Sequence, residues 1–274
     1  MHADVTFVRR IVNSLNYRVL APLTNRDARN WASKTDFRKA HRRLLQQLRS
    51  TYTNDEAVRR AVGGEFEGYG ALLRDALIFH GLASNDYLID VGCGSGRLAK
   101  PLAAYLKGKY LGIDVVPGLV DYARKLVARS DWRFEIAEGL KIPEADGQAD
   151  MVCFFSVLTH LLHEESFVYL REAKRVLKPG GKIVFSFLDF RVPSHWGSFE
   201  SNVRDIGIGA QPMNVFVCAD MLREWAKRLE LQIEVIHDGD EPYVPLSAPI
   251  TFEDRTVATD RAAIGQSVCV MVRN

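Results

Sequence analysis

Five apolar runs of strand length occur in the middle of the chain, and segments with helical periodicity separate most of them. The runs are rich in valine, isoleucine, leucine and phenylalanine, which is typical of strands covered on both faces of a sheet. They span residues 87–91, 109–116, 132–137, 150–157 and 182–188. Strands that alternate with helices in this way predict an α/β domain with a parallel sheet.

The pattern changes after the fifth run. A helix is expected over 219–229, followed by strands over 232–237 and 266–272. Residues 189–214 and 238–260, in contrast, show little periodicity. Segments this long without regular structure are usually functional in a compact domain. Because the first of them leaves the carboxyl end of a strand, we expect both to be insertions on the substrate side of the domain.

The first 66 residues differ from the rest in charge. They hold 13 Lys and Arg against 6 Asp and Glu, a net charge of +7, whereas the remainder carries −5. Apolar residues recur at helical spacing over 8–19 and again over 34–51, where basic residues are dense. We expect a helical cap whose apolar stripes pack on the core. The alternatives are a lid over the site, which is compatible with packing, and a basic surface for an anionic substrate or a membrane.

Three alternating glycines, Gly92, Gly94 and Gly96, follow the first strand and precede a helical segment at 97–106. A strand, a glycine turn and a helix start together let a ligand approach the backbone closely. The spacing is G-x-G-x-G rather than the G-x-G-x-x-G that serves a pyrophosphate. Asp90 stands just before it, and a carboxylate there would repel phosphate but attract a cationic amine.

A second acidic residue, Asp114, ends the next predicted strand. It follows Asp90 by 24 positions, about one strand–helix–strand unit. A carboxylate at this place can accept hydrogen bonds from both hydroxyls of a ribose. The two acidic residues and the glycines between them therefore describe a site for a nucleoside with a positively charged tail in place of phosphates.

These motifs resemble those of the class I S-adenosylmethionine-dependent methyltransferases of the small-molecule type. The matching segments are Asp90-Val91-Gly92-Cys93-Gly94-Ser95-Gly96, Gly112-Ile113-Asp114 and Leu177-Lys178-Pro179-Gly180-Gly181-Lys182, in the expected order. The resemblance is clear over residues 67–190, loose over the C-terminal strands and absent from the first sixty or so residues. It implies a Rossmann-like, doubly wound sheet of seven mostly parallel strands with an antiparallel last strand. Residues 1–66 would then form the helical cap and 67–274 the domain that binds S-adenosyl-L-methionine.

The resemblance also implies a set of cofactor-binding residues. They are Asp90, Gly92, Cys93, Gly94, Gly96, Asp114, Val115, Glu138, Gly139, Phe155 and Ser156. The adenine amino group would be recognised by the side chain of Glu138 or by the backbone at Gly139 and Leu140. Tyr69 precedes the first strand at a place that often reaches the methionine end of the cofactor, although a packing role is equally compatible with the sequence.

Two histidines are candidates for catalysis. His160 matches a position near the transferred methyl group and would act as a general base toward a hydroxyl or amine, with a structural hydrogen-bonding role as the alternative. His195 lies in the first insertion, together with Asp189 and Trp196, as a candidate for contact with the acceptor. His160 and His163 lack a third ligand at convincing spacing, so no metal site is predicted.

The leading hypothesis is O- or N-methylation of a small molecule such as a sugar, a polyketide or another secondary metabolite. The fourth strand ends without the Asn/Asp-Pro-Pro-Tyr/Phe motif of enzymes that methylate amide or nucleobase nitrogens, which argues against that subclass. The alternatives are an RNA or protein methyltransferase that uses the basic N-terminal region, and a non-catalytic partner subunit. A net charge of +2 gives no general case for nucleic acid. Four cysteines without a C-x-x-C pair and no long apolar run favour a cytoplasmic protein.

Overall fold

The computed structural model describes residues 37–63, 65–205 and 214–274. The helix predicted over 8–19 lies outside the described residues. The second predicted N-terminal helix is present as α2 (Phe37–Thr51) and is followed by α3 (Asn54–Ala61). No helix within the described ranges is long and apolar enough to span a membrane.

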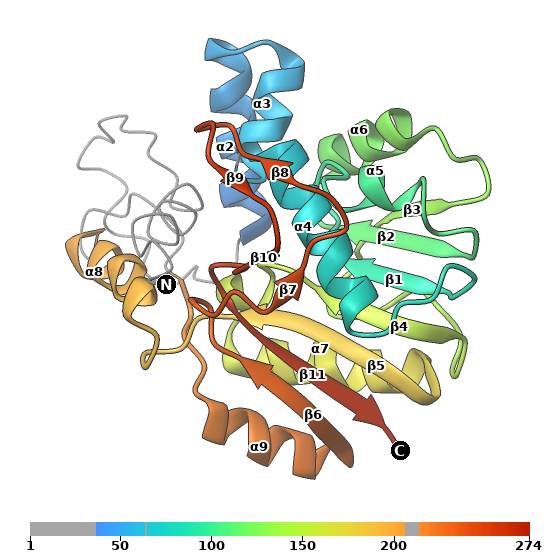
Figure 1. Ribbon diagram of the computed structural model, residues 1–274. Helices are drawn as coiled ribbons and strands as arrows, with labels where there is room; N and C mark the ends of the chain where they lie inside the picture. Colours follow the sequence, from blue (N-terminus) through green and yellow to red (C-terminus); the bar gives the residue numbers. More distant parts are fainter. Residues whose placement is uncertain (1–36, 64, 206–213) are drawn as a thin grey trace.

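A seven-stranded sheet forms the centre of the molecule (Figure 1), in the order β3-β2-β1-β4-β5-β11-β6. The strands are β1 (Leu88–Val91), β2 (Tyr110–Asp114), β3 (Arg133–Ile136), β4 (Ala149–Phe154), β5 (Leu177–Phe187), β6 (Leu231–His237) and β11 (Ser267–Arg273). The first five pair in parallel, and β11 runs antiparallel between β5 and β6. The predicted fold class, including the antiparallel last strand, is confirmed.

Helices cover both faces of this sheet. One face carries α4 (Phe66–Phe79), α5 (Ala99–Leu102) and α6 (Pro117–Val127), and each of these helices contributes buried residues to the same hydrophobic cluster. The other face carries α7 (His163–Val176) and α9 (Ala219–Arg228). Side chains alternate along a strand, so Leu88 faces the first layer and Ile89 the second.

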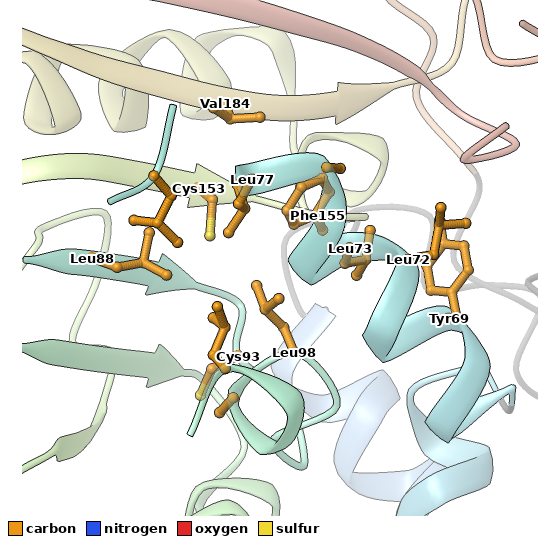
Figure 2. Packing of buried hydrophobic residues seen from close by; sticks show 14 of the residues in the cluster. Tyr69, Leu72, Leu73, Leu77, Leu88, Cys93, Leu98, Cys153, Phe155 and Val184 are labelled. Carbon is orange, nitrogen blue, oxygen red and sulfur yellow. The ribbon is translucent and has the colours of Figure 1, made fainter. Parts of the chain in front are cut away.

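Leucines of α4 fill the first layer (Figure 2). Leu72, Leu73 and Leu77 are almost completely buried and lie in one cluster with Leu88 and Cys153 of the sheet. Complete burial of a leucine side chain stabilises the folded state by about 1.5–3 kcal/mol. Packing of this kind holds α4 against the sheet beside the glycine loop.

The glycines at 63, 64, 68 and 70 predict a turn that leads into a helix at Ala71, but the N-terminal part of α4 is helical. The helix starts at Phe66, five residues before the predicted start at Ala71. A β-carbon at Gly70 would lie 2.3 Å from the carbonyl oxygen of Arg97, and one at Gly68 would lie 3.1 Å from the ring of Phe252. These glycines therefore serve close helix packing rather than a turn.

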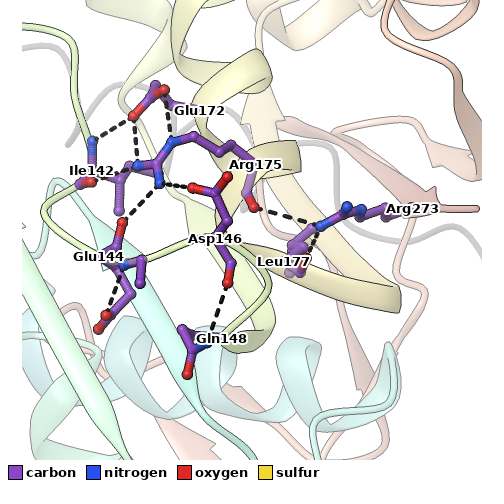
Figure 3. Close-up of polar contacts among 9 residues, drawn as sticks. Ile142, Glu144, Asp146, Gln148, Glu172, Arg175, Leu177 and Arg273 are labelled. Atoms are coloured by element: carbon purple, nitrogen blue, oxygen red, sulfur yellow. Dashed lines mark hydrogen bonds and ion pairs between the residues drawn. The ribbon is translucent and has the colours of Figure 1, made fainter.

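Arg175 of α7 holds the connection between β3 and β4 (Figure 3). Its guanidinium group donates to the carboxylates of Glu172 and Asp146 and to the carbonyls of Ile142 and Glu144. Several charge-assisted bonds from one side chain give this loop a defined path. The loop begins at the carboxyl end of β3, where one wall of the site is formed.

The two predicted insertions are more regular than expected. Residues 193–205 form a short 3₁₀ turn, η3 (Pro193–His195), and helix α8 (Trp196–Asp205), so the expectation of an irregular segment is wrong there. The second insertion contains β7 (Val244–Pro245), β8 (Ile250–Thr251) and β9 (Val257–Ala258). Strands β7 and β8 pack against α4. Strand β7 pairs with β10 (Arg261–Ala262), and β8 pairs with β9.

Candidate active site

A cavity opens at the carboxyl ends of the parallel strands, where sheets of this kind bind their ligands. Its walls come from the glycine loop, the end of β2, the end of β4 and the turn after it, and the residue before β11. Ala61 and Val62, at the end of α3, complete the wall above the glycine loop. The N-terminal helices therefore contribute directly to the site.

Asp114 lines this cavity at the end of β2. One carboxylate oxygen accepts a hydrogen bond from the backbone N–H of Gly94 at 3.0 Å, and the other accepts one from Val116 at 2.9 Å. Burial raises the pKa of this carboxyl group, and the two N–H donors oppose that shift. These two hydrogen bonds also fix the position of the glycine loop relative to the end of β2.

The glycine loop divides its residues between the cavity and the core. Gly92 and Gly94 line the cavity and have φ angles of +81° and +54°. A β-carbon at Gly94 would lie 2.7 Å from a methyl group of Val62. Gly96 and Cys93 do not line the cavity; Gly96 packs against Ala123, and Cys93 is buried. Two of the four predicted loop contacts are thus placed where a ligand can reach them.

Asp90 lies in the core beside the cavity and is not one of the residues that line it. Its carboxylate accepts hydrogen bonds from the Tyr110 hydroxyl at 2.7 Å and from the Cys153 thiol at 3.6 Å. Burial raises the pKa of Asp90 to about 6. The position of Asp90 in the motif suggests direct contact with a cationic ligand, but the structure does not show this access. The side chain of Asp90 points to the same side of β1 as Leu88, which faces the layer of α4.

The connection after β3 differs from the expectation in a similar way. Ala137 lines the cavity, whereas Glu138 and Gly139 are exposed and do not. Tyr169 of α7 lines the cavity too, and its hydroxyl donates to the carbonyl of Gly139 at 3.1 Å. The structure thus presents Ala137 and Tyr169 at the place where the sequence suggested Glu138.

Phe155 and Ser156 line the cavity at the end of β4, and Val115 lines it after β2, as predicted. Ser156 has a φ angle of +58°, which is uncommon for a residue with a side chain. Its backbone N–H donates to the hydroxyl of Ser186 on β5 at 2.7 Å. This bond compensates for the strained backbone and orients the turn that follows.

The two candidate catalytic histidines have different surroundings. His160, in the 3₁₀ turn η2 (Leu158–His160), lines the cavity. His195 is completely buried and does not line it; its Nδ1 atom lies 2.9 Å from the backbone nitrogen of Asp189. Burial lowers the pKa of His195. The imidazole of His195 thus organises the segment that follows β5 and does not reach the site.

Tyr69 also takes the packing role. It is 2% exposed, and its hydroxyl donates to the carbonyl of Ile264 at 2.9 Å. The guanidinium group of Arg97 lies over its ring, 4.6 Å from the centroid, and Arg97 in turn lines the cavity. The aromatic ring supports this arginine from behind.

Several lining residues had no signal in the sequence strong enough to select them. They are Ala61, Val62, Thr159, Leu188, Ser198, Asn214 and Gln266. They belong to no spacing motif, and they meet only because α3, the β4 and β5 ends, α8 and the start of β11 converge at one edge of the sheet. Among the described residues no group of three His, Cys, Asp or Glu side chains is arranged to hold a metal ion.

The chain matches a family model described as a methyltransferase domain over residues 89–185. This range includes the glycine loop, Asp114, the β4 end and most of β5. A solved S-adenosylmethionine-dependent methyltransferase from Aquifex aeolicus has the same fold, with a TM-score of 0.53 at 17% identity, covering 83% of this chain and 97% of that one.

Three curated relatives of the chain are named methyltransferases, two of them O-methyltransferases. A ubiquinone biosynthesis O-methyltransferase of Xanthomonas oryzae is 31% identical over 54% of this chain and 63% of its own length, so the match spans less than two thirds of that protein. A 27-O-demethylrifamycin SV methyltransferase of Amycolatopsis mediterranei is 29% identical over 47% of this chain and 48% of its own length. A ubiquinone biosynthesis O-methyltransferase of Ruegeria pomeroyi is 30% identical over 84% of this chain and 87% of its own length. With a match of that extent, the chain belongs to the S-adenosylmethionine-dependent methyltransferase family, and S-adenosyl-L-methionine is its cofactor, as its motifs predict.

Proposed function

We propose that the protein transfers a methyl group from S-adenosylmethionine to a hydroxyl group of a small-molecule acceptor. The observation that carries this proposal is a single cavity that begins at Asp114 and the glycine loop and continues past Ser156 and His160 to Gln266. One part has the groups that a nucleoside requires, and the other is left for an acceptor. Two of the relatives described above are named O-methyltransferases, and these names favour oxygen over nitrogen as the acceptor atom.

The residues at the β1 and β2 ends fit the cofactor. The Asp114 carboxylate has lone pairs for the ribose hydroxyls beyond the two backbone bonds that it accepts. Gly92 and Gly94 line the cavity with backbone that carries no side chain. Asp90 would act on the cationic amino group through the field of its carboxylate and through the loop, since its side chain does not line the cavity.

The sulfonium of the cofactor supplies an activated methyl group, so the protein's main task is to align the acceptor oxygen with it and to exclude water. Val62, Phe155 and Leu188 provide apolar walls for this purpose. His160 would take the proton of the acceptor hydroxyl, because it lines the cavity beside the β4 end and histidine is the side chain that most often serves as a general base.

We also propose that residues 1–66 act as a cap that closes the cofactor end of the cavity, on a methyltransferase domain of residues 67–274. Ser95 of the glycine loop donates to the carbonyl of Val58 in α3 at 3.2 Å. The apolar side chains of α2 and α3 pack on Val116 and Leu119. A cavity that this cap closes would suit a small acceptor better than RNA or protein. The four unpaired cysteines fit a reducing compartment such as the cytoplasm.

Calorimetric titration with S-adenosylhomocysteine, followed by a labelled-methyl assay with a panel of small hydroxy compounds, tests the proposal. We expect saturable binding of the nucleoside and label in an alkali-stable ether product. Binding without transfer to any hydroxy compound, together with transfer to an RNA or protein fraction, would overturn the assignment of the acceptor class. No binding of the nucleoside at all would overturn the whole proposal.

A further inference from the structure

Gln266, the residue before β11, has an amide group whose orientation is determined by two serines. Its side-chain oxygen accepts hydrogen bonds from the Ser186 hydroxyl at 2.6 Å and from the Ser156 hydroxyl at 3.4 Å. Gln266 is only 5% exposed, yet it lines the cavity. A buried amide usually has hydrogen-bond partners on both its oxygen and its nitrogen, and here the described chain provides them for the oxygen.

The direction of these bonds follows from the backbone. The hydroxyl oxygen of Ser186 accepts the N–H of Ser156 at 2.7 Å, so its own proton points onward, and the Gln266 oxygen is in place to accept it. Ser186 is 1% exposed and needs that acceptor. The chain of bonds therefore turns the amide oxygen of Gln266 toward the serines and its NH₂ group away from them.

The NH₂ group then faces the cavity. Among the described residues none accepts a hydrogen bond from this nitrogen, and Gln266 lines the cavity beside Ser156. The NH₂ group offers two N–H donors whose orientation is already fixed, because the two serine hydroxyls hold the amide oxygen. Little free energy is therefore needed to orient these donors toward a ligand. A ligand oxygen is the partner that such donors suit.

The position of Gln266 indicates which ligand this is. Asp114, the ribose-binding candidate, ends β2, and β11 lies four strands away in the order β2-β1-β4-β5-β11. Strands are spaced by about 4.8 Å, so the two strands are roughly 19 Å apart. The glycine loop, where the rest of the cofactor is expected, follows β1. The area over β4, β5 and β11 is thus left to the acceptor.

We propose that the Gln266 amide donates a hydrogen bond to an oxygen of the acceptor that neighbours the methylated hydroxyl, and thereby selects acceptors that carry two adjacent oxygens. This inference rests on the proposed methyl transfer. The bonded oxygen is the neighbour rather than the nucleophile, because donation to the nucleophile would stabilise the ground state and slow the attack. Ser186, which does not line the cavity, acts as a positioning residue for the amide.

The experiment compares acceptors that differ by one oxygen. The probes are catechol against phenol and 1,2-cyclohexanediol against cyclohexanol, with labelled S-adenosylmethionine in excess. The readout is the ratio of kcat/KM within each pair, which is independent of the fraction of active protein. We expect the wild type to prefer the member with two oxygens, and Gln266→Met to reduce that preference about tenfold, the value of one good hydrogen bond.

Three further variants and measurements make the result decisive. Gln232→Met, an exposed glutamine on β6, is the matched control and should leave the ratio unchanged. Ser186→Ala, which frees the amide, should lower the ratio in the same direction but less. Affinity for S-adenosylhomocysteine and for 5′-methylthioadenosine should stay at the wild-type value in Gln266→Met.

Two results would overturn the inference alone. One is an unchanged ratio in Gln266→Met while the wild type transfers methyl groups. The other is a tenfold loss of affinity for S-adenosylhomocysteine without a loss for 5′-methylthioadenosine, which would place the amide at the amino-acid end of the cofactor. A wild type that transfers to none of the four probes would instead count against the proposed function, and the inference would fall with it.

Discussion

The two ends of the cavity differ in the kind of polar group that they offer. At the end formed by β1 and β2, the lining residues include the acidic side chain of Asp114, the basic side chain of Arg97 and the backbone of the glycine loop. At the end formed by β4, β5 and β11, the described lining residues are apolar or uncharged, apart from the titratable His160. Thr159 and Gln266 are examples of the uncharged polar groups there.

The difference agrees with the proposed division of the cavity between the cofactor and the acceptor. A cofactor that is always the same, with a ribose and an ionised amino-acid tail, can be matched by charges at constant places in the motif. Charges at the acceptor end would have to be desolvated for an uncharged acceptor, at a cost of several kcal/mol. Neutral donors avoid that cost and still orient an oxygen. Substitutions at the two ends should therefore separate cofactor affinity from turnover.

The largest expected effect is at Asp114. Asp114→Ala removes the acceptor for two ribose hydroxyls and should weaken S-adenosylhomocysteine binding roughly 100- to 1000-fold, since each bond to a charged group contributes about 1.5–3 kcal/mol. Calorimetry measures the affinity, and circular dichroism verifies that the variant is folded. Retention of wild-type affinity by a folded variant would refute the ribose assignment.

At the other end, His160→Ala should slow turnover about 100-fold through the loss of a general base while leaving the affinity for S-adenosylhomocysteine intact. Single-turnover transfer of labelled methyl at saturating acceptor is the measurement. His163→Ala is the control, because the His163 ring contacts the carbonyl of Phe216 outside the cavity. A wild-type rate in His160→Ala would exclude the base role.

A smaller effect is expected in the glycine loop. Gly94→Ala places a methyl group 2.7 Å from Val62 at a φ of +54°, so the loop or α3 must shift, and nucleoside affinity should fall about tenfold. Gly180→Ala is the matched control, with a φ of +78° and nothing within 4 Å of the new methyl. It should cost about 1 kcal/mol of stability and leave affinity unchanged. Equal affinity in both variants would contradict the close contact with α3.

The smallest effect concerns Asp90 and depends on pH. Because its folded pKa of about 6 exceeds the usual value near 3.8, the folded state binds an extra proton between these limits. The stability that Asp90 contributes is complete below pH 4 and is lost as the pH rises through 6. Asp90→Asn should therefore raise the melting temperature at pH 8 but not at pH 4.

The same variant sharpens the comparison between the two ends. At pH 8 the Asp90 carboxylate is ionised and attracts the amino group of the nucleoside, so Asp90→Asn should bind S-adenosylhomocysteine about threefold more weakly. At pH 5 the two proteins should bind alike, because Asp90 is then protonated. A difference in affinity that is constant from pH 5 to pH 8 would show that charge is not the cause.

Much of the fold was predictable because it follows local rules. Apolar runs placed the seven strands of the central sheet, and the glycine spacing with Asp114 predicted the cofactor. Two errors had a common origin. The glycines of α4 and the segment now in α8 lack a clear local pattern, and their conformations depend on distant partners such as the carbonyl of Arg97. Local periodicity carries no information about such contacts.

In the site, too, some features were predictable from the sequence and others depended on the tertiary structure. By itself the sequence determined the sheet and the cofactor and predicted the nucleoside end of the cavity, because a short motif places its residues at neighbouring strand ends. Tertiary structure alone decided that Asp90 faces Tyr110 instead of the cavity, that His195 is buried, and that Gln266 comes to Ser156 across 110 positions of sequence. The physical reason is that orientation and long-range contact depend on which layer a side chain faces, and only the packed sheet and helices establish that.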